Sequence, residues 1–155
     1  SIALPFSLLV LLSYSAGDYY EWRIQMGFFF LLWANDTFAY LTGRWLGKNK
    51  LWESISPKKT IEGFIGGLLF CVGTGFLIAQ FWDVLPAWKW MGMSVIVAFA
   101  GTFGDLSESL LKRKAGVKDS GNLLPGHGGV LDRFDGITLA IPLVSLFLYF
   151  SKFGL

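Results

Sequence analysis

Cysteine and histidine, the side chains that most often build redox and zinc sites, each occur only once in this sequence. Cys71 alone can form neither a disulfide within the chain nor a cysteine-based metal site. His127 has no second histidine at the spacing of a zinc site, which argues against zinc. Any metal chemistry is therefore expected to use oxygen ligands.

Charge is also scarce. Asp, Glu, Lys and Arg make up 15% of the 155 residues, whereas a soluble domain carries about 25%. The sequence is 54% hydrophobic, with a mean hydropathy of +0.53, and its apolar residues form long blocks. A helix that spans a membrane needs roughly 20 such residues. These values argue against a water-exposed globular domain. They predict a single membrane-embedded domain over residues 1–155, because no linker or repeat divides the chain.

Five apolar segments are expected to form helices, at residues 2–15, 24–45, 62–82, 90–104 and 136–154. The predicted fold class is therefore all-α, a polytopic transmembrane helical bundle of about five segments. Threading the segments back and forth places ten of the 13 Lys and Arg residues on one side, which the positive-inside rule assigns to the cytoplasm. The cytoplasmic loops, above all the polar stretch 105–135, are expected to carry the chemistry.

Two patterns predict how these helices sit in lipid. Segment 62–82 carries glycines in a small-xxx-small arrangement, which lets helix backbones approach closely, at Gly63, Gly66, Gly67, Gly73 and Gly75. We interpret these glycines as packing residues rather than as a site. Trp82, Trp88 and Trp90 are expected to form an aromatic belt at the non-cytoplasmic interface.

Asn35 and Asp36 lie near the middle of an apolar segment. A charge at that depth costs about 2.5–3.5 kcal/mol on insertion scales, so such residues usually face a bundle interior or a wet cavity. Asp36, Tyr40, Gly43 and Arg44 recur at helical spacing and form one polar, small-residue face. This face is predicted to line a cavity, with simple pairing of Asp36 to a base on a neighbouring helix as the alternative.

The basic loop Ser56-Pro-Lys-Lys-Thr60 directly precedes the third apolar segment. Thr60 is expected to cap a helix that begins near Ile61 or Glu62, and the free N–H groups of that first turn favour an anion. Lys58 and Lys59 add positive charge. The alternative is an ordinary loop that binds anionic lipid headgroups.

The polar stretch 105–135 combines carboxylates, bases and glycines. Its first part places four polar residues on one helical face, Asp105, Glu108, Ser109 and Lys112. A loop follows whose glycines can bring backbone N–H groups close to phosphate oxygens, Gly121, Gly126, Gly128 and Gly129. Asp132 and Asp135 then begin the final helix, one turn apart. Hard oxygen ligands beside Lys and Arg suit a Mg²⁺–nucleotide, and Mg²⁺ typically takes only one or two protein carboxylates.

These residues resemble the signature of phosphatidate cytidylyltransferases. The matching strings are Ser109-x-Leu-Lys-Arg113, Lys118-Asp119-x-Gly121 and Leu124-Pro-Gly-His-Gly-Gly129-Val-x-Asp132-Arg-x-Asp135. Upstream, Gly104-Asp105-x-x-Glu108-Ser109, Asp36-x-x-Ala39-Tyr40 with Gly43-Arg44, and Ser56-Pro-Lys-Lys-Thr60-x-Glu62-Gly63 also fit. Ile61 stands where members often carry an aromatic residue. The resemblance covers about residues 33–136.

The resemblance implies an enzyme of the bacterial inner membrane that transfers a cytidylyl group from CTP to phosphatidic acid, giving CDP-diacylglycerol and pyrophosphate. It implies Mg²⁺ as cofactor, with a second cation beside it left open, and membrane lipids as surroundings. No nucleic-acid partner is expected, and a homodimer is left open. It also implies that the chain is roughly the C-terminal half of a longer protein. Ser1 opens an apolar run that no basic segment precedes, so we expect a truncation rather than a signal peptide.

The resemblance further implies individual roles. Asp105 and Asp132 are expected to hold the metal, with Lys118 and Arg133 as the other catalytic residues. Asp135 is expected to assist through a water or to orient Arg133. The remaining expected substrate contacts are Asn35, Asp36, Lys58, Lys59, Ser109, Lys112, Arg113, Asp119, Gly126, His127, Gly128 and Gly129. Asn35 and Asp36 would line the entry of the lipid headgroup.

Three other functions remain as alternatives. A CTP-dependent lipid kinase acting on a polyprenol or phytol would release CDP rather than pyrophosphate. A transporter or channel subunit would use Asn35 and Asp36 in an ion path. A structural membrane subunit would leave the clustered bases and carboxylates unexplained.

Overall fold

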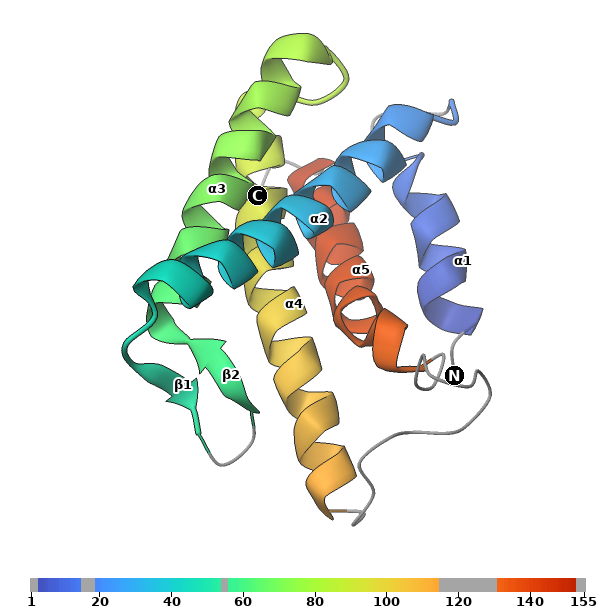
Figure 1. Ribbon diagram of the computed structural model, residues 1–155. Coiled ribbons are helices and arrows are strands. Elements are labelled where there is room, and N and C mark those ends of the chain that lie inside the picture. The colour runs from blue at the N-terminus through green and yellow to red at the C-terminus, as the bar shows by residue number, and fades with distance from the viewer. Residues whose placement is uncertain (1–2, 15–18, 54–55, 115–130, 153–155) are drawn as a thin grey trace.

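The computed structural model describes residues 3–14, 19–53, 56–114 and 131–152. Within these ranges the chain forms five helices and one β-hairpin (Figure 1). The helices are α1 (Ala3–Leu12), α2 (Trp22–Leu46), α3 (Ile61–Phe81), α4 (Ala87–Lys114) and α5 (Leu131–Lys152). The hairpin connects α2 to α3 and consists of β1 (Lys50–Trp52) and β2 (Ser56–Thr60).

Each predicted apolar segment coincides with a helix, so the prediction of a mostly helical fold is confirmed. The expectation of an all-α chain is corrected by the hairpin, in which Lys50 pairs with Thr60 and Trp52 with Ser56 in antiparallel register. A hairpin this short is marginal by itself. It forms here because the ends of α2 and α3 hold its two strands together. Helix α4 also runs beyond the predicted segment, to Lys114, so Asp105 is helical.

The helices pack in chain order, with α2 on α3, α3 on α4 and α4 on α5, while α1 lies against α5. Their shared core contains fully buried side chains from α2, α4 and α5, among them Phe28, Trp90, Met93, Ile141 and Val144. In Figure 1, α4 and α5 run in opposite directions, so the end of α4 and the start of α5 lie at the same end of the bundle as the hairpin.

Glycines set the distance between α2 and α3. A β-carbon added at Gly63 would lie 2.8 Å from the carbonyl oxygen of Ala39 and 3.0 Å from the Cα of Gly43. At Gly67 it would lie 2.8 Å from the Cβ of Ala39 and 3.0 Å from the backbone oxygen of Asn35. The predicted close packing is thus confirmed for Gly63 and Gly67, and Gly66 and Gly75 are equally tight, against Thr42 and Ser94. The prediction is wrong for Gly73, which has no atom within 4 Å of such a β-carbon.

Trp90 is a core residue, which corrects the expected aromatic belt. Its side chain is fully buried, and its ring packs on Gly27 and on Trp82, with ring centroids 6.4 Å apart for the two tryptophans. Gly27 of α2 leaves the space that the indole fills. The sequence pattern of α4 alone does not indicate that this space exists. Trp88, by contrast, remains exposed.

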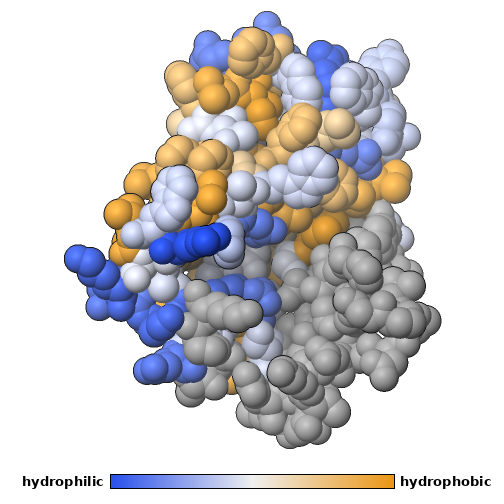
Figure 2. All heavy atoms as spheres, in the orientation of Figure 1, coloured by the Kyte–Doolittle hydropathy of each residue, from blue (hydrophilic) through white to orange (hydrophobic). Residues whose placement is uncertain are grey.

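Two helices, α3 and the Ala87–Ser107 part of α4, are long and apolar enough to cross a membrane. Both expose large apolar side chains, among them Leu69, Leu77, Phe81, Phe99 and Phe103. Figure 2 shows apolar side chains over α3 and hydrophilic ones gathered around the hairpin. Extended apolar surface is rare on soluble monomers, and these features are those of a membrane protein. Helix α1 has ten residues and reaches roughly 15 Å, about half of a bilayer core.

Gly67→Ala is expected to destabilise the bundle by about 1–3 kcal/mol, because the new methyl group meets the backbone of α2, which cannot move aside without shifting the helix. Gly73→Ala on the same helix is the matched control. It should leave stability unchanged or raise it by up to about 1 kcal/mol through helix propensity. Thermal unfolding in detergent, followed by circular dichroism, measures both variants. Equal stability of the two would contradict the glycine contact.

Candidate active site

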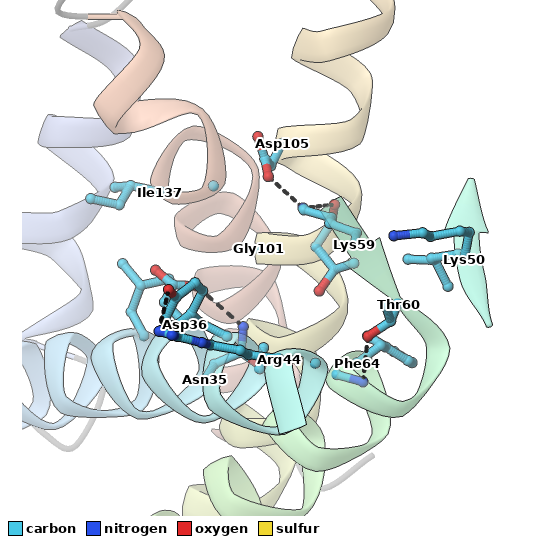
Figure 3. Close-up of a pocket in the computed structure, with 18 residues that line it drawn as sticks. Asn35, Asp36, Arg44, Lys50, Lys59, Thr60, Phe64, Gly101, Asp105 and Ile137 are labelled. Atoms are coloured by element: carbon cyan, nitrogen blue, oxygen red, sulfur yellow. Dashed lines mark hydrogen bonds and ion pairs between the residues drawn. The ribbon is translucent and has the colours of Figure 1, made fainter. Parts of the chain in front are cut away.

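A cavity of about 650 Å³ opens at the hairpin end of the bundle (Figure 3). Its polar lining comes from α2, the hairpin and α4, and comprises Asn35, Asp36, Tyr40, Arg44, Lys50, Lys59, Thr60, Thr102 and Asp105. Glycines and apolar residues of α3 and α5, including Gly63 and Ile137, complete the wall. This volume lies within the range of about 300–1,000 Å³ that small-molecule sites occupy.

Helix α2 contributes a buried amide beside a carboxylate. Asn35 is 3% exposed, and its Nδ2 donates to Oδ1 of Asp36 over 3.4 Å. The amide is enclosed by glycines of two neighbouring helices, Gly67 of α3 and Gly101 of α4. Asp36 itself is exposed and faces the cavity. Together with Tyr40 and Arg44 it forms the predicted cavity-lining face, and it makes no ion pair with any base whose side chain the structure describes.

The start of α3 is fastened by two side chains. Thr60 is the N-cap, and its Oγ1 accepts the N–H of Gly63 over 3.1 Å, as predicted. The carboxylate of Glu62 accepts the backbone N–H groups of Lys48 and Asn49, each over 3.2 Å, and the side-chain amide of Asn49 over 2.7 Å. These bonds tie the turn after α2 to the first turn of α3. Lys59, next to the cap, is therefore held at the rim of the cavity.

Lys59 bridges the hairpin and α4. Its Nζ lies 2.5 Å from Oδ2 of Asp105 and donates to the carbonyl oxygen of Thr102 over 3.1 Å (Figure 3). The two charged side chains are 26% and 46% exposed. An ion pair with this degree of exposure contributes about 1 kcal/mol or less. The contact consequently orients the two side chains more than it stabilises the fold.

A close contact between α4 and α5 determines where the acidic residues of α5 lie along the bundle relative to Asp105. A β-carbon at Gly136 would lie 3.4 Å from the Cα of Gly101. Asp105 follows Gly101 by one helical turn, and Asp132 precedes Gly136 by one turn. Because the two helices are antiparallel (Figure 1), positions 105 and 132 lie at the same height along the bundle. The prediction that Asp132 and Asp135 begin the final helix is confirmed for the backbone. The structure does not describe the side chains of residues 131–135, which include Arg133.

The described residues contain no group of three or more His, Cys, Asp or Glu side chains that could hold a metal. Mg²⁺ does not require such a group, since one or two carboxylates and bound phosphate suffice. The carboxylate of Asp105 lines the cavity, and the backbone of Asp132 lies at the same height along the bundle as Asp105. Hard oxygen donors in a cavity that also holds bases fit Mg²⁺ with a polyphosphate, in which cations neutralise the phosphate charge.

The other predicted site residues are not gathered at this cavity in the part of the chain that the structure describes. Ser109 lies on α4 one turn beyond Asp105 and does not line the cavity. Three lysine or arginine residues belong to described elements, but their side chains are outside the description, namely Lys58 in β2 and Lys112 and Arg113 in α4. Lys118, Asp119, Gly126, His127, Gly128 and Gly129 lie in residues 115–130, outside the described ranges.

Two cavity-lining bases were not among the expected substrate contacts, although one of them, Arg44, belonged to the predicted cavity-lining face. Arg44 lies two turns after Asp36 on the same face of α2, the spacing from which its cavity-lining position was predicted, and its Nη1 donates to the hydroxyl of Tyr40 over 3.4 Å. Lys50 reaches the cavity only because β1 pairs with β2. No local pattern signals Lys50, since its position depends on the hairpin.

The sequence matches the Cytidylyltransferase family over residues 2–151. It is 49% identical over 121 residues to phosphatidate cytidylyltransferases of Staphylococcus aureus (strain COL) and Staphylococcus haemolyticus (strain JCSC1435), and 46% identical to one of Staphylococcus epidermidis. Each match covers 77% of this chain and 46% of the relative, so the chain spans about half the length of the curated relatives it matches. Nearly the whole helical bundle and its cavity lie within the matched range, and the chain belongs to the cytidylyltransferase family.

Proposed function

We propose that this chain carries the catalytic region of an enzyme that transfers a cytidylyl group from CTP to phosphatidic acid. The observation that carries the proposal is the cavity in which Lys59 and Asp105 meet the polar face of α2, at the end of the apolar bundle where hydrophilic residues gather. A site of this kind lies where a water-soluble nucleotide and a membrane lipid can both reach it. The names of the relatives support the same reaction.

In this reaction a phosphate oxygen of phosphatidic acid attacks the α-phosphorus of CTP. The bond from that phosphorus to the bridging oxygen of the β-phosphate breaks, and pyrophosphate leaves with the electron pair. The attacking phosphate is already ionised at neutral pH, so no protein nucleophile is needed. Because two polyanions must meet, the main tasks of the protein are charge neutralisation and positioning.

Acidic and basic residues of the cavity are proposed to perform different parts of these tasks. Asp105 and Asp132 would hold Mg²⁺, alone or with a second cation, which when bound offsets the phosphate charge. Lys59, Arg44 and Lys50 supply positive charge from the α2 and hairpin walls. Five bases outside the described side chains are proposed to add phosphate contacts, Lys58, Lys112, Arg113, Lys118 and Arg133. Asn35 and Asp36 are proposed to receive the lipid headgroup.

The proposal includes a topology in which α2 and α5 cross the membrane alongside α3 and α4, with the cavity at the cytoplasmic end. Helix α2 has 25 residues and is roughly 37 Å long, more than the roughly 30 Å hydrocarbon core. Its charged face turns toward the cavity rather than toward lipid. The excess of Lys and Arg at this end supports the orientation.

The reaction is tested by pyrophosphate release from the purified chain in detergent, with CTP, Mg²⁺ and phosphatidic acid omitted in turn. We expect release to require all three and CDP-diacylglycerol to appear by mass spectrometry, with ATP unable to replace CTP. A phosphorylated lipid and CDP would instead identify a lipid kinase. If neither the chain nor a longer protein that contains it releases pyrophosphate, the cytidylyl transfer is refuted.

Asp105→Asn is expected to lower turnover by about 10²–10³-fold, the loss typical of removing one electrostatic contact to the reacting groups. Asp83→Asn is the matched control, because Asp83 is an exposed carboxylate in the α3–α4 link, outside the cavity. Turnover is measured for both variants after circular dichroism has established equal helix content. Full activity of Asp105→Asn would remove Asp105 from the proposed site.

A further inference from the structure

Asp105, a proposed ligand of the metal, already has a positively charged partner. The Nζ of Lys59 lies 2.5 Å from its Oδ2. We propose that Lys59 is a positioning residue that neutralises Asp105 while no divalent cation is bound and competes with that cation for the carboxylate. Cation binding would then release the ammonium group into the cavity, where it can meet a phosphate. This inference rests on the proposed function for the role of Asp105.

The competition follows from the position of the ammonium group. Its two contacts, the carboxylate of Asp105 and the carbonyl of Thr102, are one turn apart on α4. A divalent cation held by the same carboxylate would lie close to Nζ, and two positive charges so near each other repel. Asp36, across the cavity on α2, lies within electrostatic range of both Lys59 and Asp105.

The surrounding structure allows the side chain to move without the backbone. The position of Lys59 in the chain is held by the Thr60 cap and by the pairing of β2 with β1. The ammonium group sits on a flexible four-carbon stem, so it can leave Asp105 while β2 stays in place. Arg44 and Lys50 line the same cavity but form no ion pair with any carboxylate whose side chain is described. Among these three bases, Lys59 is thus set apart by its contact with Asp105.

The test measures the binding of Mn²⁺, a paramagnetic substitute for Mg²⁺, by electron paramagnetic resonance of the free ion. It uses the purified chain in detergent without nucleotide or lipid. Lys59→Gln should bind Mn²⁺ roughly fivefold more tightly than the unaltered chain, the factor that corresponds to a partly exposed ion pair at the upper end of its range. Lys59→Arg keeps the charge and should bind as the unaltered chain does.

Lys50→Gln is the matched control, because it removes the same charge from the same cavity without touching Asp105. Its effect on Mn²⁺ affinity should be clearly smaller. In an Asp105→Asn background, Lys59→Gln should have no further effect, since the shared partner is gone. Lys59→Met, which keeps most of the stem, provides the same measurement if thermal unfolding finds Lys59→Gln unstable.

Equal tightening by Lys59→Gln and Lys50→Gln would overturn the proposal, because general electrostatics would then explain the effect. Unchanged, weaker or undetectable Mn²⁺ binding by both Lys59→Gln and Lys59→Met would overturn it as well. The result is separate from the proposed reaction. Tighter Mn²⁺ binding without CDP-diacylglycerol formation would count against the reaction alone, and CDP-diacylglycerol formation without tighter binding against the role of Lys59 alone.

Discussion

The close approach of α2 and α3 organises both the helix packing and the cavity. Gly63 and Gly67 let the backbone of α3 touch that of α2 at Ala39 and Asn35. Lipid provides little hydrophobic force between helices, so such van der Waals contact between small residues is what holds them together. The same contact encloses the amide of Asn35 and turns the next residue, Asp36, toward the cavity. Helix packing and the composition of the cavity therefore have one cause.

The cavity places charge at the boundary between an apolar bundle and a hydrophilic end. In such surroundings a charge interacts more strongly than in water and is costly unless it has a partner. Lys59 and Asp105 form an ion pair between two elements that are distant in sequence. The Thr60 cap and the Glu62 carboxylate hold the hairpin that carries Lys59. The cavity therefore holds both an acidic and a basic side chain on elements whose backbones are fixed by packing and capping.

Local patterns predicted a large part of this arrangement. Runs of apolar residues predicted all five helices, because helices satisfy their own backbone hydrogen bonds where water is absent. The cap at Thr60 and the start of α5 near Asp132 depend on neighbouring residues only, and both were predictable. The burial of Trp90 was not, because it depends on the gap that Gly27 leaves on another helix. The hairpin was missed for a similar reason, since its short strands are stabilised by the ends of α2 and α3.

The amino-acid sequence alone predicted an apolar helical protein with its basic and acidic residues concentrated near a few helix ends, and its motifs indicated the family. Those properties follow from composition and from spacing along the chain. The folded structure was needed to find that Lys59 contacts Asp105, that Lys50 lines the cavity, and that Gly101 and Gly136 bring α4 and α5 together. Each of these depends on a distance between separate elements. Such a distance is set by how helix surfaces fit together, and no local stretch of sequence contains it.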